Sequence, residues 1–175
     1  MASTSLKAAL TIAVVIVVSA VLQFSGALAP VNAAPGRPLE VGQEVVTARW
    51  RMTVLGAELT EDERLGAPQL QVTMRLTHTG EVARTPSADE FVRVESPAGR
   101  PLELRLPGVV CNPGVPTEVV VAADWPEEAP PGEVPVRVVL LDQKRVDLPY
   151  AVPQWEGGGA RGHVDLIAPD HREET

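Results

Sequence analysis

Apolar and polar residues alternate strictly in two segments of the chain. From Val46 to Val54 every second residue is apolar, and the residues between are threonines and arginines. The segment from Leu70 to Thr77 repeats this pattern. Because successive side chains of a β-strand point to opposite faces, a period of two predicts a strand with one buried and one exposed face. Both segments are therefore predicted to be half-buried strands.

Shorter apolar runs follow, and turn-forming residues separate them. The runs are 91–95, 102–106, 118–122, 134–140, 146–148 and 164–166. Proline and glycine cluster between them, and Gly157–Gly159 is expected to be one of the turns. Seven or eight short strands predict an all-β, antiparallel β-sandwich. The only helix expected after residue 30 is a single turn at Thr60–Arg64, where Thr60 and Glu63 could form a capping box.

The N-terminal segment differs from the rest of the chain. The 22 residues from Ala8 to Ala29 carry no charge, and a helix of that length would be about 33 Å long. This is enough to cross the apolar core of a bilayer, so the segment predicts a transmembrane anchor. A signal peptide cleaved near Ala33, after Val31-Asn-Ala, is the alternative. Both interpretations place everything after about residue 34 outside the cytoplasm.

These patterns divide the chain into four parts. Residues 1–33 form the anchor or signal peptide, and residues 34–42, rich in proline and glycine, form a linker. Residues 43–168 form the sandwich and are numerous enough for one hydrophobic core. Residues 169–175 are polar and are expected to be a disordered tail.

The layout resembles a family of immunoglobulin-like extracytoplasmic domains of unknown function in actinobacterial membrane-anchored proteins. The apolar N-terminal segment, the proline-rich linker and the first strand with Trp50 carry the resemblance. The Pro-Gly turns before residues 115–121 and 134–138 add to it. The resemblance covers roughly residues 40–170. It implies an immunoglobulin-like sandwich outside the membrane, and it supplies no catalytic residues.

The amino-acid composition excludes several kinds of partner and binding site. With 15 basic and 23 acidic residues the net charge is −8, which argues against nucleic acid, because such partners require a dense basic patch. A single cysteine excludes an internal disulfide framework and a cysteine-based zinc site. The three histidines show no metal-ligand spacing. We therefore expect no cofactor and no metal.

Arginine and threonine occupy the polar phase of the first two predicted strands. Arg49 and Arg51 lie on the first strand, and Thr73 and Arg75 lie on the second. If the two strands are neighbours in one sheet, these side chains form a basic face on a negatively charged domain. Such a face predicts docking of an acidic envelope protein or an anionic wall polymer. An ordinary solvated sheet face is the alternative.

Tryptophan and cysteine supply the remaining candidates. Trp50 shares the apolar phase of the first strand and is expected in the core. Trp125 and Trp155 lie at strand ends, where each either closes the end of the sandwich or is exposed for recognition. Cys111 is expected to be a buried apolar residue. An intermolecular disulfide and a nucleophile paired with a histidine are the alternatives for Cys111.

Together these features predict a non-catalytic interaction module of the cell envelope, tethered to the lipid bilayer through residues 8–29. The first alternative is a secreted or tethered domain that binds a small ligand or ion in a pocket lined by Trp125 or Trp155. The second is a cysteine-dependent envelope enzyme, which requires a histidine within about 3–4 Å of Cys111.

Overall fold

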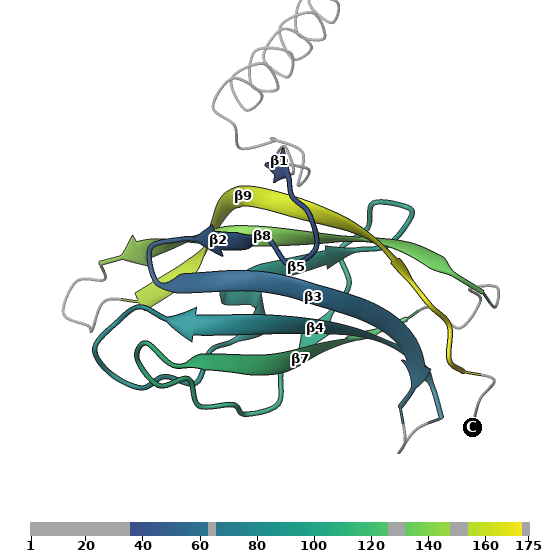
Figure 1. Cartoon of the computed structure of the whole chain (residues 1–175), viewed down its shortest axis with the longest axis horizontal. Coiled ribbons are helices and arrows are strands. Elements are labelled where there is room, and N and C mark those ends of the chain that lie inside the picture. The colour runs from purple at the N-terminus through teal and green to yellow at the C-terminus, as the bar shows by residue number, and fades with distance from the viewer. Residues whose placement is uncertain (1–35, 63–65, 126–131, 148–153, 173–175) are drawn as a thin grey trace, which may run out of the picture. The chain divides into compact units, whose positions relative to one another are not determined.

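The computed structural model describes residues 36–62, 66–125, 132–147 and 154–172. These residues form two packed β-sheets with nine strands in all (Figure 1). One sheet has the strand order β1-β9-β8-β5, and the other has the order β2-β3-β4-β7-β6. The predicted all-β sandwich is thus confirmed.

The strands vary widely in length. The five-stranded sheet contains β2 (Glu44–Val46), β3 (Trp50–Glu61), β4 (Pro68–His78), β6 (Leu104–Arg105) and β7 (Pro116–Asp124). The four-stranded sheet contains β1 (Arg37–Pro38), β5 (Val92–Glu95), β8 (Val134–Val146) and β9 (Gln154–Ala168), and the 3-10 helix η1 (Ala88–Glu90) precedes β5. Every pair of neighbouring strands is antiparallel except β1 and β9.

The alternation of apolar residues places the core between the two sheets. Trp50 and Met52 of β3 are fully buried, as the period of two predicts, and Val138 and Leu140 of β8 belong to the same cluster. A β-bulge between Val54 and Gly56 shifts the register of β3 against β4. The inward phase of β3 therefore changes parity, and Leu59 is buried beyond the bulge.

Strand β3 is longer than expected because it has partners on both edges. Its second half pairs with β4 as far as Glu61, and Thr60 lies opposite Gln69. On the other edge, the Leu59 amide donates to the carbonyl of Pro169 over 2.8 Å. The helical turn expected to start at Thr60 is therefore wrong for the part of it that the structure describes. The extended backbone satisfies its polar groups in the ladder instead.

Both ends of the described domain extend the sandwich past the expected boundaries. Arg37 and Pro38, in the predicted linker, pair with Gly162 and His163 of β9, and Leu39 is buried. In the predicted tail, the His171 amide donates to the Leu59 carbonyl over 2.8 Å. The expected anchor or signal peptide, residues 1–33, lies outside the described residues. The described part of the chain contains no helix long and apolar enough to cross a membrane.

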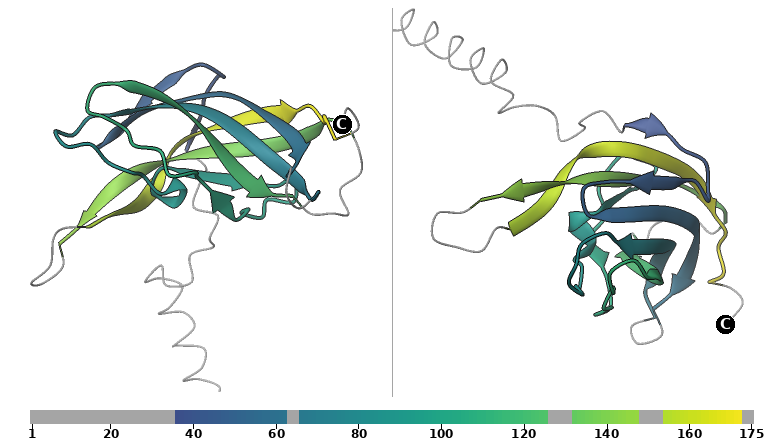
Figure 2. Two further views of the ribbon diagram at one scale, coloured as in Figure 1. Left: turned by 90° about the horizontal axis from the view of Figure 1, so that it is seen from below. Right: turned by 60° about the vertical axis from the view of Figure 1, so that its left-hand side comes forward.

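The three consecutive glycines are strand residues rather than a turn. Gly157 to Gly159 lie inside β9, and Gly157 is paired with Gln143 of β8. The hairpin of β8 and β9 projects beyond the other strands in both views of Figure 2. This projecting end lies on the side where β3 begins and β4 ends (Figure 1).

Candidate functional site

Three residues of the predicted basic face lie together on the outer side of the five-stranded sheet. Arg51 on β3 and Arg75 on β4 are exposed, and Thr73 is half-buried two residues from Arg75. The strands are neighbours, as the prediction requires, with Thr53 opposite Arg75. Within the described part of the chain, neither guanidinium forms an ion pair. We call Arg51, Thr73 and Arg75 the outer arginine face.

Acidic residues of the adjoining strands interrupt this face. Glu44 of β2 lies opposite Thr53, and Glu118 of β7 lies opposite Arg75. One row across the sheet therefore reads Glu44, Thr53, Arg75, Glu118. The predicted basic face is therefore flanked by acidic side chains, because β2 and β7 border the two strands on which it lies.

Arg49 does not belong to the outer face. It precedes β3, and its Nη2 lies 3.1 Å from Nε2 of His78. His78 shares the inward phase of β4 and is only 1% exposed, so Arg49 turns toward the end of the sandwich. Its guanidinium carbon also lies 4.9 Å from the centre of the Trp155 ring, a cation–π contact. The predicted place of Arg49 on the basic face is therefore wrong.

Arg84 and Glu90 complete a polar cluster around His78. Arg84 Nη2 lies 2.7 Å from Glu90 Oε1, and both residues are part of the connection between β4 and β5. Unpaired buried atoms are concentrated here: Arg49 Nη1, Arg84 Nε and Glu90 Oε2 have no hydrogen-bond partner among the described residues. We call Arg49, His78, Arg84, Glu90 and Trp155 the end cluster. Sequence reasoning missed it because its members are far apart in the chain.

The surroundings of His78 disfavour protonation of its imidazole. Burial is the main cause that lowers the pKa of His78, and the positive charges of Arg49 and Arg84 lower it further. The Val82 carbonyl and the Glu90 carboxylate act in the opposite direction. The pKa of Arg49 is also lowered, mainly by burial and then by Arg84, but a guanidinium remains charged. Arg49 can only donate, so Nε2 of His78 accepts the hydrogen bond.

The two candidate recognition tryptophans differ in exposure. Trp125 follows β7, is 5% exposed and belongs to the core, so it closes the sandwich rather than presenting a surface. Its backbone amide donates to Pro68 over 3.0 Å. Trp155 is half-buried on β9 against Arg49. Of the two, only Trp155 retains surface that a partner could contact.

Cys111 is a buried free thiol. Its backbone exchanges two hydrogen bonds with Arg84, of 3.0 and 2.8 Å, and its side chain interacts with Thr117. Burial raises the pKa of the thiol, and the hydrogen bond from Thr117 only partly opposes this. A buried thiol with a raised pKa is a poor nucleophile and is inaccessible to a second chain. This environment suits the apolar role predicted for Cys111.

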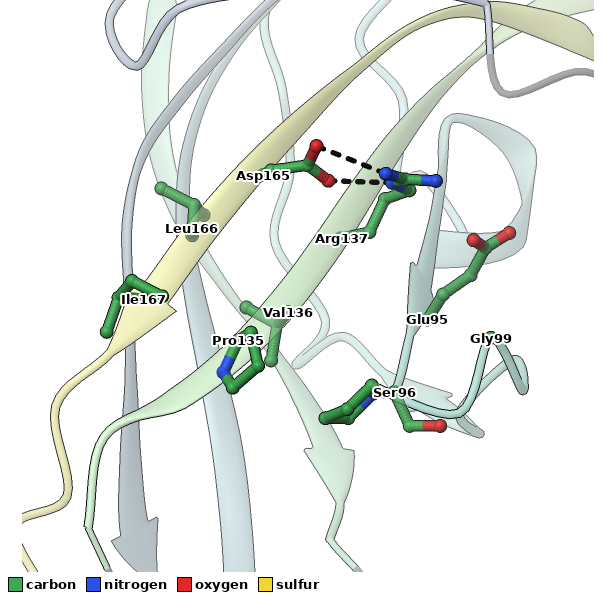
Figure 3. A pocket seen from close by; sticks show the side chains of 10 residues that line it. Glu95, Ser96, Gly99, Pro135, Val136, Arg137, Asp165, Leu166 and Ile167 are labelled. Atoms are coloured by element: carbon green, nitrogen blue, oxygen red, sulfur yellow. Dashed lines mark hydrogen bonds and ion pairs between the residues drawn. The ribbon is translucent and has the colours of Figure 1, made fainter.

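A pocket of about 390 Å³ lies on the four-stranded sheet beyond the end of β5 (Figure 3). Arg137 donates to both carboxylate oxygens of Asp165, over 2.6 and 3.1 Å, at one side of this pocket. Glu95 pairs with Arg93 at 3.0 Å. The carboxylates of Asp165 and Glu95 are therefore each paired with an arginine. No tryptophan lines this pocket, so it is not the one that the ligand-binding alternative requires.

Within the described ranges, no three histidine, cysteine, aspartate or glutamate side chains are arranged to hold a metal ion.

Comparison with known proteins places the chain in no family. No family model matches it, and no curated protein matches its sequence. An uncharacterized β-sandwich protein from Clostridium difficile 630 is similar with a TM-score of 0.46 at 10% identity, over 75% of this chain and 93% of that one. A secreted protein from Mycobacterium tuberculosis is similar with a TM-score of 0.45 at 9% identity, over 77% of this chain and 98% of that one. Likeness at this level transfers no function.

Proposed function

We propose that the chain is a non-catalytic interaction module of the cell envelope, tethered to the bilayer through residues 8–29. The uncharged N-terminal stretch supports the tether, because it has the length and composition of a membrane-spanning helix. Cleavage near Ala33 is the alternative, and it would release the same domain outside the membrane. The buried Cys111, whose thiol pKa is raised by burial, is a poor nucleophile and supports a non-catalytic role.

The strand order supports an immunoglobulin-like assignment. Strands β3 to β9, lettered A to G, give the sheets A-B-E-D and G-F-C, which is the arrangement of a constant-type immunoglobulin domain. Strand β2 extends the first sheet beside β3, and β1 extends the second beside β9. Domains of this fold use their sheet faces and end loops for binding, but the fold alone specifies no partner.

The observation that carries the proposal is the outer arginine face. Arg51 and Arg75 are exposed on adjacent strands and have no ion-pair partner among the described residues. The sheet fixes the backbone of both arginines, so binding has to order only their side chains, and two guanidiniums favour carboxylate groups on a partner. Glu44 and Glu118 flank them and would repel a uniform polyanion. The face therefore favours an envelope protein with carboxylates at spaced positions over an anionic wall polymer.

In-cell crosslinking with mass spectrometry tests this surface. We expect the double variant Arg51→Glu and Arg75→Glu to lose the crosslinked partner, because it places four acidic side chains on the face. The melting temperature should stay within about 2 °C of the native value, since exposed substitutions change stability little. Arg100→Glu is the matched control, because Arg100 is exposed in a turn and belongs to neither site.

A partner that the double variant retains would refute the outer arginine face as the docking surface. Loss of the partner in the Arg100→Glu control as well would show that net charge, not this face, governs binding. The same spectra test the tether independently. Peptides from residues 8–29 in the mature protein would support the anchor. A new N-terminus at Ala34 would instead show that the segment is a cleaved signal peptide and that the domain is secreted.

A further inference from the structure

We propose that the end cluster is an acid-sensitive latch, in which protonation of His78 frees the β4–η1 connection and Trp155 while the two sheets remain folded. The proposal concerns a part of the molecule that the outer arginine face does not include. The two proposals can therefore be tested independently of each other.

The hydrogen bond between Arg49 and His78 exists in only one protonation state of the imidazole. A guanidinium has donors and no acceptor, so Nε2 of His78 must carry a lone pair at the 3.1 Å distance observed. A proton on Nε2 would direct one N–H group at another and add a positive charge beside Arg49. The contact would then change from attractive to repulsive.

The groups packed around His78 offer little compensation for a new positive charge. Arg49 faces it from the segment before β3 and Arg84 from the β4–η1 connection, while Glu90 is the acidic group facing it, from η1. Glu90 is already paired with Arg84 at 2.7 Å. The Trp50 ring of β3 lies 4.8 Å from the imidazole, centre to centre, and adds no charge. Protonation would thus leave three cations and one carboxylate in a site with little access to water.

His78 has no room to move away from this conflict. It is 1% exposed, and a Cβ placed on Gly80 would lie 2.7 Å from its ring. The ring can therefore reach water only if the chain after β4 lifts off it. Residues 79–83 lie in this stretch, and Val82 within it is 76% exposed. Beyond them, Arg84 is bound through its backbone to Cys111.

Displacement of Arg49 would also reach the β8–β9 hairpin. The same guanidinium that contacts His78 covers the face of Trp155. Loss of this contact would increase the exposure of Trp155 on β9. The apolar core between the sheets includes neither Arg49 nor His78. The change in charge therefore acts only at this end of the sandwich, and opening is confined to it.

Hydrogen exchange on the full-length chain in detergent micelles tests the latch. Protection factors, corrected for intrinsic exchange, are measured at pH 7.5 and 5.0 for the native chain, for His78→Gln and for the control His171→Gln. We expect protection of residues 79–83 and of the backbone next to Trp155 to fall in the native chain by about tenfold for each unit by which the native pKa of His78 is depressed, up to a ceiling of about 30-fold, because pH 5.0 lies about 1.5 units below the ordinary value of about 6.5. The control should behave like the native chain, and His78→Gln should show no such fall.

Two results would overturn the proposal. One is an equal loss of protection in His78→Gln, and the other is a loss spread evenly over both sheets. Should His78→Gln fail to fold, the native chain alone decides the matter through NMR titration of its three histidines. A His78 ring that titrates at or above the ordinary value of about 6.5 would also exclude the latch.

Discussion

At the scale of single residues, the glycine triplet of β9 shows how one missing side chain positions an element. A Cβ on Gly157 would lie 2.5 Å from the carbonyl oxygen of Asp89, so η1 can approach β9 only over a glycine. Two residues further, Gly159 has open space around the same position. Glu90 of the end cluster belongs to η1 and therefore depends on this close approach.

Gly157→Ala should consequently destabilise the domain, whereas Gly159→Ala should not. The added methyl group meets a backbone carbonyl that cannot rotate away, and overpacking of this kind costs about 1–3 kcal/mol. Urea unfolding of both variants measures the difference, and the free energy of unfolding should fall only for Gly157→Ala. Equal effects of the two substitutions would contradict the close approach.

The sequence predicted individual residues well where the chain is regular and poorly where it bends. Trp50 and Arg51 lie on the faces that the period of two assigns to them. Arg49 fits the same period, but it precedes the strand at a bend, so its side chain reaches His78 instead. The glycines were expected in a turn because sequence alone does not distinguish a glycine needed for a turn from one needed for close packing.

At the scale of elements, the edge of β8 beyond β5 is closed to further strands by a proline. The Leu141 amide donates to Phe91, whereas the carbonyl of Val94 accepts from Leu102 on the opposite side of β5. Odd-numbered residues of β8 therefore direct their backbone groups toward β5. The next such residue past the end of β5 is Pro135, which has no N–H to donate. The pocket of Figure 3 lies at this position.

Pro135→Thr should restore a donor at this edge and promote strand addition between copies of the chain. Sedimentation velocity should show dimers or larger species that depend on protein concentration. Pro97→Thr is the matched control, since Pro97 lines the same pocket but lies outside the strands. A Pro135→Thr protein with the sedimentation behaviour of the control would show that the missing N–H does not protect this edge.

A strand could be predicted from the sequence where apolar and polar residues alternate along it. The period of two located β3, β4 and most of β8, but it gave no pairing order, so Glu118 was not recognised as the neighbour of Arg75. Strand β1 spans two residues, Arg37 and Pro38, which is too short for any period to be visible. It forms because β9 offers an unpaired edge, and such an edge is a property of the assembled sheet.

At the scale of the whole molecule, the C-terminal segment fastens the two sheets to each other. Leu59 of the five-stranded sheet exchanges hydrogen bonds with the backbone of Pro169 and His171, directly after β9 of the other sheet. The Asp170 carboxylate accepts hydrogen bonds from the Gly132 amide over 2.8 Å and from the Arg172 guanidinium over 2.7 Å. One carboxylate thus joins the segment before β8 to the segment after β9.

The Asp170 carboxylate gives the domain a second acid-sensitive contact, which responds in a lower pH range than the contact of His78. Hydrogen bonds from Arg172 and from the Gly132 amide hold the pKa of Asp170 well below its usual range. Its contribution to stability is present above the unfolded-state pKa of about 3.9 and is lost as pH falls further. The effect of His78 begins earlier, below about pH 6.5, because its native pKa is depressed and the unfolded chain binds the proton first.

Asp170→Asn should therefore lower the melting temperature at pH 7 and flatten the loss of stability below pH 4. An asparagine keeps one acceptor but loses the charge that Arg172 pairs with, so the C-terminal segment is held less firmly against the start of β8 at every pH above 4. Thermal unfolding between pH 7 and pH 2.5 separates the two contributions, because His78→Gln should flatten the curve from about pH 6.5 downward, whereas Asp170→Asn should flatten it only below about pH 4. If Asp170→Asn kept the native curve below pH 4, this carboxylate would not be what holds the C-terminal segment to the start of β8.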